Sequence, residues 1–146
     1  MSAVDSGYYE AQRRGIDDQY AAQMASNTFS RTLAQQRGQR DLSFMRQGLN
    51  RQAPSFTAGF AQRGFGGGQQ SGVMRRSMSN YLGDFNTSYG QAQTDLYDQL
   101  RQYDLTGAQL GANRTSQLAD MELNKAREIS YAASNIEALR QIMGGT

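Results

Sequence analysis

The sequence predicts an all-α protein of long extended helices or a helical hairpin, with coiled-coil-like seams. Three observations support this class. Apolar residues recur three or four residues apart over long stretches, the only proline is Pro54, and glycines gather in one tract. We therefore expect an N-terminal helical arm over residues 1–53, basic toward its end. The arm is followed by a Pro/Gly-rich joint over residues 54–72 and then by a long helical segment over residues 73–146.

The C-terminal segment has the clearest helical periodicity. Its apolar residues alternate between three- and four-residue spacings, which is typical of a coiled-coil or bundle seam. Between Leu110 and Leu118 the spacing is eight, which reads as a local phase shift. A helix from about Val73 to about Ile142 is roughly 100 Å long at 1.5 Å per residue. The residues that we assign to a seam for helix packing or oligomer formation are Met78, Leu82, Phe85, Tyr89, Leu96, Leu100, Tyr103, Ile129, Ile136 and Leu139.

The N-terminal arm has a weaker pattern. Short apolar stripes flank a polar stretch, residues 34–40, and Gly38 is the expected place of any kink. Because Pro54 lacks a backbone donor, the helix is expected to end before it. The following tract predicts a hinge, since glycine leaves the backbone unrestrained. The hinge residues are Gly64, Gly66, Gly67 and Gly68.

Glycines also recur inside the predicted helices, and they have two interpretations. Each weakens a helix interior by about 1 kcal/mol relative to alanine. Alternatively, a residue without Cβ allows a neighbouring helix to approach closely. The pairs Gly83 with Gly90 and Gly107 with Gly111 have spacings that place each pair on roughly one face. The pattern alone leaves both interpretations open.

Composition excludes several kinds of site. Cysteine and histidine are absent, which removes thiol catalysis, disulfides, the usual zinc sites and the commonest general base. The glycine tract does not fit a nucleotide loop, because no β-branched strand precedes it and no lysine lies nearby. Carboxylates at helical spacing, such as Asp95 and Asp98 or Glu10 and Asp17, fit an exposed helix face better than a catalytic pair. We expect no catalytic residue, cofactor, metal or small-molecule substrate, and membrane contact stays open.

Charge is unevenly distributed, although the formal net charge is only +2. Arginines dominate residues 31–76, whereas acids dominate residues 77–123. If the joint closes a hairpin, the basic arm faces the acidic arm, which is the interpretation that we prefer. Binding of nucleic acid is the alternative, because arginine neutralises phosphates. The arginines that would contact DNA or an acidic helix are Arg31, Arg37, Arg40, Arg46, Arg51, Arg63, Arg75 and Arg76.

The centre of the chain resembles virion proteins of tailed bacteriophages. The resemblance rests on Ala61-Gln62-Arg63-Gly64, Gln70-Ser71-Gly72-Val73 and Arg75-Arg76-Ser77-Met78, followed by the Tyr- and Asp-containing heptads from Tyr89 to Tyr103. It covers roughly residues 42–140, and the GFGGG insertion departs from the pattern. It implies a virion component in the head interior, the portal region or the tail, released with the genome or retained, and it carries over no catalytic residue.

These observations favour a non-enzymatic structural subunit of a phage virion, present in many copies. Thin apolar stripes on long helices call for symmetric neighbours. The implied partners are copies of the chain itself, portal, adaptor or internal virion proteins, and packaged DNA, with a role in genome ejection. The alternatives are a nucleic-acid-binding helical protein and a subunit of an exported bacterial helical filament.

Overall fold

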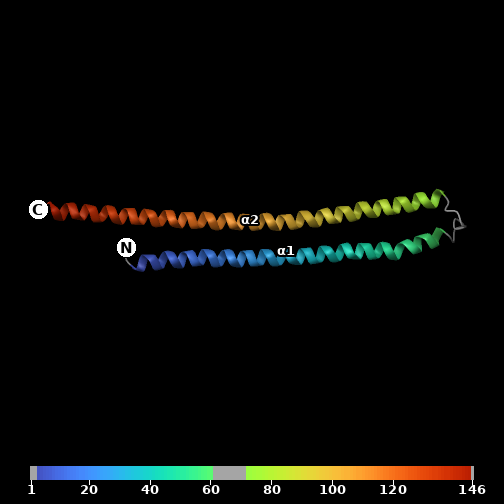
Figure 1. Cartoon of the computed structure of the whole chain (residues 1–146), viewed down its shortest axis with the longest axis horizontal. Coiled ribbons are helices and arrows are strands. Elements are labelled where there is room, and N and C mark those ends of the chain that lie inside the picture. The colour runs from blue at the N-terminus through green and yellow to red at the C-terminus, as the bar shows by residue number, and fades with distance from the viewer. Residues whose placement is uncertain (1–2, 61–71, 146) are drawn as a thin grey trace. The chain divides into compact units, whose positions relative to one another are not determined.

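The computed structural model describes residues 3–60 and 72–145, and these residues form two helices. Helix α1 spans Ala3–Phe60 with 58 residues, and helix α2 spans Gly72–Gly144 with 73 residues (Figure 1). No strand occurs in these ranges, which confirms the predicted all-α class. The expected hinge glycines Gly64, Gly66, Gly67 and Gly68, together with Arg63, lie outside the described residues.

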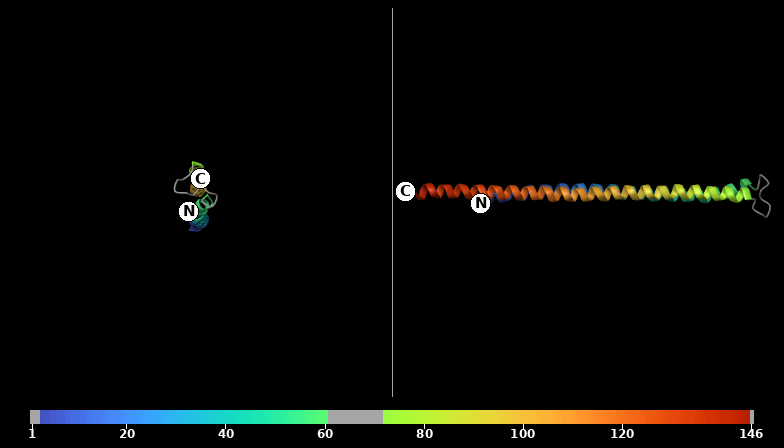
Figure 2. Two further views of the ribbon diagram at one scale, coloured as in Figure 1. Left: turned by 90° about the vertical axis from the view of Figure 1, so that its right-hand side faces the viewer. Right: turned by 90° about the horizontal axis from the view of Figure 1, so that it is seen from above.

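The chain divides into two units, and each contains part of both helices. The first unit consists of Met1–Thr28 with Asp104–Thr146, and the second of Phe29–Tyr103. Within each unit the α1 and α2 segments lie side by side (Figures 1 and 2). Contacts between them run in opposite chain directions. The contact pairs are Tyr9–Lys125 and Tyr20–Arg114 in the first unit, and Arg46–Tyr89 and Gln52–Tyr81 in the second. Each unit is therefore an antiparallel helix pair, as a helical hairpin requires.

The ends of the helices agree with the sequence pattern except at Pro54. Helix α1 continues through this proline to Phe60, so the expectation that the helix ends before residue 54 is wrong. A proline inside a helix removes one backbone hydrogen bond. Pro54 is exposed, and water can therefore satisfy the carbonyl oxygen that loses its partner. Helix α2 begins and ends within two residues of the predicted limits.

The positions of α2 that α1 covers recur every eleven residues. Three columns of partly or fully buried positions follow this step. An eleven-residue repeat has about 3.67 residues per turn, close to the 3.6 of an undistorted helix. Two such helices can stay in contact without the left-handed supercoil of a heptad seam. The columns are Met74–Phe85–Leu96–Gly107–Leu118, Met78–Tyr89–Leu100–Gly111 and Tyr81–Ala92–Tyr103–Arg114–Lys125.

Helix α1 has the same period, and its partners on α2 follow it. A step of eleven residues along α1, from Tyr9 to Tyr20, exchanges the partner Lys125 for Arg114, eleven residues back along α2. The matched periods therefore define the register of this pair. The covered columns of α1 are Tyr9–Tyr20–Arg31–Leu42–Ala53 and Ile16–Asn27–Gly38–Leu49.

The structure does not confirm the heptad seam that the three- and four-residue spacings predicted. The heptad pattern selects Leu82, whereas the half-buried position is Tyr81 and Leu82 stays 40% exposed. The apparent phase shift before Leu118 has a simple cause. The covered positions in this gap are Gly111 and Arg114, which an apolar pattern does not register.

The helix pairs bury few side chains. Among the residues described, only Tyr9, Ala34, Met74 and Met121 form a buried apolar core, and no side chain is completely enclosed. Several covered columns instead contain glycine, asparagine or arginine. Burial of apolar area stabilises a fold by about 25 cal/mol per Å², so one helix pair of this composition gains little from its own core.

One glycine allows the helices of the second unit to approach closely. A Cβ atom added at Gly38 would lie 2.7 Å from Cδ2 and 2.9 Å from Cγ of Leu96. Helix α1 continues through Gly38, so this glycine is a packing position rather than the end of a helix. Gly48, on the same helix, has open space around it.

Substitution of these two glycines by alanine should have opposite effects on stability. Gly48→Ala is expected to raise the free energy of unfolding by about 0.5–1 kcal/mol, because alanine is the better helix former. Gly38→Ala is expected to lower it by about 1 kcal/mol, because the new methyl group overpacks against Leu96. Urea unfolding followed by circular dichroism measures both values. Equal stabilisation by the two substitutions would contradict the close contact, and Leu96→Ala should relieve the effect of Gly38→Ala.

Candidate interaction surface

The structure separates the predicted seam residues into two groups. The first group is partly covered by the partner helix, whereas the second lies beyond it: Ile129, Ile136 and Leu139 are 45%, 55% and 57% exposed. Leu82 belongs to neither group, because it is 40% exposed and lines a groove along α2. The members of the first group are Met78, Phe85, Tyr89, Leu96, Leu100 and Tyr103.

A polar cluster joins the helices of the first unit. Nε of Arg114 donates a hydrogen bond to Oδ1 of Asp17 at 2.9 Å, and Nη2 of Arg114 lies 2.8 Å from the same oxygen. The guanidinium carbon also lies 5.1 Å from the centre of the Tyr20 ring. The positive charge of Arg114 therefore lies at a covered position and is paired there with Asp17 and the Tyr20 ring.

The same arrangement recurs eleven residues away. The ammonium nitrogen of Lys125 lies 5.9 Å from the ring centre of Tyr9, which is the second most buried residue of the described core. The apolar pattern did not select Arg114 or Lys125 as seam residues, because neither side chain is apolar. The signal was nevertheless present, since the two cations and the two tyrosines have the same spacing of eleven.

For six of the arginines, the structure does not show the expected pairing of the basic arm with the acidic arm. Arg46 lies over the Tyr89 ring at 5.2 Å rather than beside a carboxylate. Asp84, Asp95 and Asp98 are exposed. The arginines Arg37, Arg40, Arg46, Arg51, Arg75 and Arg76 are exposed as well. Within the described ranges, no ion pair joins an acid to the exposed arginines Arg37, Arg40, Arg46, Arg51, Arg75 and Arg76.

The exposed arginines do not form one basic surface. Arg40 and Arg51 are eleven residues apart and therefore share one outward face of α1. Arg75 and Arg76 are neighbours on α2 and point in directions about 100° apart. Arg31 differs from the rest because it is half-buried and belongs to a covered column.

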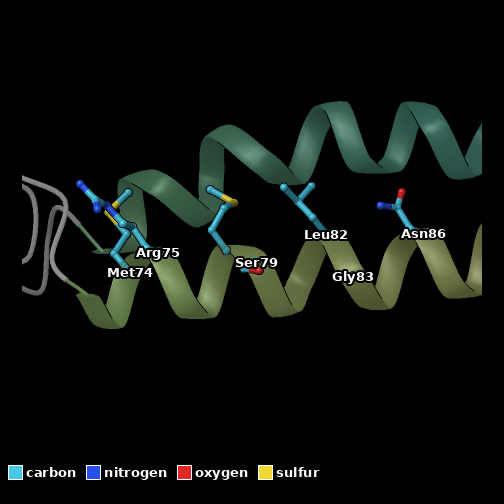
Figure 3. Close-up of a pocket in the computed structure, with 7 residues that line it drawn as sticks. Met74, Arg75, Ser79, Leu82, Gly83 and Asn86 are labelled. Atoms are coloured by element: carbon cyan, nitrogen blue, oxygen red, sulfur yellow. The ribbon is translucent and has the colours of Figure 1, made fainter.

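One groove lies along α2 near its beginning (Figure 3). It has a volume of about 520 Å³ and is lined by Met74, Arg75, Met78, Ser79, Leu82, Gly83 and Asn86. These residues offer thioether and aliphatic surface with one cation, and no acid–base pair. The side chains of α1 residues 55–58 and 60 lie outside the described set, so we assign no ligand to this groove.

An apolar stripe near the end of α2 is exposed to solvent. Residues 126–144 are all exposed. Eleven-residue steps from the covered positions Leu118 and Lys125 lead to Ile129 and Ile136. A third column runs from the buried Met121 through Ala132 to Met143, which is 75% exposed. We call Ile129, Ala132, Ile136 and Met143 the C-terminal stripe, and Leu139 lies at its edge.

The C-terminal stripe is thus a continuation of the face that α1 covers. A contiguous apolar surface of this kind marks an interaction site in water-exposed proteins. The charged residues in the same stretch balance: Arg127 and Arg140 oppose Glu128 and Glu137. This stripe is the candidate functional surface of the chain.

Other kinds of site find no support in the described residues. No group of three or more acidic side chains there is arranged to hold a metal ion. No helix in the described ranges has a segment apolar enough to cross a membrane. A carboxylate oxygen of Glu10 lies 3.8 Å from a guanidinium nitrogen of Arg14 on the exposed side of α1. Asp17 forms an ion pair with Arg114, so Glu10 and Asp17 each have an arginine as neighbour.

Comparison of the chain with protein-family models, curated proteins and solved structures gives no match. A functional assignment therefore depends on the geometry of the chain itself. The resemblance to tailed-phage virion proteins stays a prediction from residues 42–140.

The contact between Asp17 and Arg114 should contribute modestly to pairing of the helices in the first unit. A double-mutant cycle with Asp17→Asn and Arg114→Gln is expected to give a coupling energy of about 0.5 kcal/mol, because both side chains are partly exposed to water. The coupling should fall as salt is added. The matched control is Asp18→Asn with Arg127→Gln, because these two exposed charges of the first unit form no ion pair with each other and their cycle should give a coupling close to zero. A similar coupling for both pairs would contradict the proposed role of Arg114.

Proposed function

We propose that the chain is a non-enzymatic structural subunit that packs in multiple copies within a larger assembly. The observation that carries this proposal is the C-terminal stripe, an uncovered continuation of the face that binds α1. Leaving large aliphatic side chains in water forgoes about 1.5–3 kcal/mol for each one that could be buried. A neighbouring subunit that covers the stripe would recover this free energy.

The sparse core supports the same proposal. Each helix pair encloses few side chains and relies on tyrosine, arginine and glycine in its covered columns. Large apolar residues also lie on the outward faces, among them Phe29, Phe44 and Leu105, which are 69%, 59% and 57% exposed. Such faces suit a subunit that is surrounded by neighbours better than an isolated molecule.

We further propose that the assembly is the virion of a tailed bacteriophage. The support is the resemblance of residues 42–140, described above. In this setting the chain packs with its own copies and with portal, adaptor or internal proteins, in the head interior, portal region or tail. Arginines on outward faces would be available to packaged DNA, which would give the chain a part in genome ejection.

The proposal is tested by asking where the chain occurs. Particles released from cultures that carry the gene should be purified on a density gradient and analysed by quantitative mass spectrometry. We expect the chain to migrate with the particles in a fixed ratio of several copies to each portal protein. Recovery of the chain only as a free monomer, with no particle fraction, would contradict the structural role.

Nucleic-acid binding is the second candidate. The outward arginines Arg40 and Arg51 favour it, because neither forms an ion pair within the described residues. If the chain binds duplex DNA, the logarithm of its affinity should fall linearly with the logarithm of salt, with a slope of about 0.9 for each phosphate contacted. Replacing both Arg40 and Arg51 by Gln should lower that slope by up to about 1.8. Fluorescence anisotropy between about 50 and 200 mM salt measures this dependence. Weak dependence on salt would exclude the candidate.

A further inference from the structure

We propose that one outward face of α1, within the second unit, binds single-stranded nucleic acid. Phenylalanine rings on this face would stack on bases, and arginines would contact phosphates. The inference rests on the nucleic-acid candidate above and specifies both the ligand and the surface that binds it. We call this surface the Phe/Arg face, and it consists of Phe29, Gln36, Arg40, Phe44, Gln47 and Arg51.

The Phe/Arg face lies on the side of α1 that is opposite α2. Arg40 is two residues from Gly38 and two from Leu42, which belong to the two covered columns. It therefore lies about 160° around the helix from each of these columns. Phe29 and Arg51 lie one eleven-residue step before and after Arg40, so the three residues form one straight column. The neighbouring columns contain Gln36 and Gln47 on one side and Phe44 on the other.

Both phenylalanine rings of this face are open to water. Phe29 is 69% exposed and Phe44 is 59% exposed. Proteins that bind single strands combine such rings, on which bases stack, with a line of positive charge that follows the phosphates. In a duplex the bases already stack on one another, so the rings would find no free base to cover. A single strand therefore fits this face better than a duplex.

The charge of the face suits a phosphate backbone. Arg40 and Arg51 lie about 16 Å apart along the helix axis, and neither forms an ion pair within the described residues. The only acid between residues 29 and 51 is Asp41. Asp41 lies about 100° around the helix from Arg40, where it lines a groove with Gly38 and Tyr103 beside the contact with α2. A phosphate at the Phe/Arg face would thus meet cations and no carboxylate.

The glutamines distinguish nucleic acid from other anionic partners. A side-chain amide both donates and accepts hydrogen bonds, as the edges of bases require, whereas an acidic peptide needs donors only. A lipid surface that received both rings would also bury Gln36 and Arg40, which lie between them, and would remove their water. The face therefore fits a nucleic-acid strand better than an acidic protein or a membrane.

Tryptophan fluorescence tests the stacking, because the natural chain contains no tryptophan. The full-length Phe44→Trp variant is titrated with an oligothymidylate of about 15 nucleotides at about 50 mM salt. Stacking of a base on the new indole should quench its fluorescence in a saturable way. The matched control is Tyr97→Trp, because Tyr97 is an aromatic residue of the same unit that is 77% exposed and lies near Asp95 and Asp98. Its fluorescence should not change.

Removal of a ring tests its contribution to affinity. Phe44→Ala should weaken binding of the oligothymidylate at least about fivefold, whereas Tyr97→Ala should change the dissociation constant by less than about twofold. A duplex of the same length should bind the natural chain at least about tenfold more weakly than the single strand. Fluorescence anisotropy of labelled DNA measures these constants, and circular dichroism checks that the variants have equal helix content.

The possible outcomes separate this inference from the proposed functions. Absence of oligothymidylate binding, equal loss in Phe44→Ala and Tyr97→Ala, or tighter binding to vesicles of phosphatidylserine and phosphatidylcholine would each overturn it. If duplex DNA binds with a steep dependence on salt and Phe44→Ala has no effect, the nucleic-acid candidate stands and the stacking face fails. If the chain migrates with particles and binds no nucleic acid, only the structural role stands. If the single strand binds and no particle contains the chain, the inference stands and the virion proposal fails.

Discussion

The feature on which the structure depends is the match between two eleven-residue periods. Because each helix repeats its covered positions at about 3.67 residues per turn, the covered face stays oriented toward the partner with little unwinding from the ideal 3.6. The contacts of Tyr9 with Lys125 and of Tyr20 with Arg114 are consecutive steps of this repeat. A shift of one residue would rotate the covered columns away from each other by about 100°.

The repeat explains why so polar a sequence forms long helices. A covered position need not be apolar if its partner suits it. The Leu96 side chain packs against Gly38, where a larger residue would collide with it. The cations of Arg114 and Lys125 lie over the rings of Tyr20 and Tyr9. Thr87, Thr94 and Thr115 donate hydroxyl hydrogen bonds to carbonyl oxygens four residues earlier, at 3.0 Å in each case, and so remain compatible with a helix. As a result, the side chains of the two helices fit together although few of them are buried.

This balance has a functional consequence. A helix pair that buries so few side chains would gain stability from contact with a neighbouring subunit, as we propose, and the exposed continuation of its seam offers a surface for that contact. The face that binds α1 along one stretch would then bind a neighbouring subunit along the next. Long helices with one uncovered stripe are well suited to join neighbouring subunits, which is the role that we propose within a virion.

The sequence by itself determined the helical class, the limits of α2 and six of its covered residues. Local periodicity is sufficient for this, because a helix repeats within the chain and needs no partner to define its face. Only the tertiary structure established that Tyr81 rather than Leu82 is covered, that Gly111, Arg114 and Lys125 belong to the seam, and that α1 continues past Pro54. An apolar pattern cannot register positions whose burial depends on a complementary side chain across the interface. The cover over Met121 and the lack of cover over Ile136 also depend on how far α1 extends along α2, and no local pattern encodes that distance.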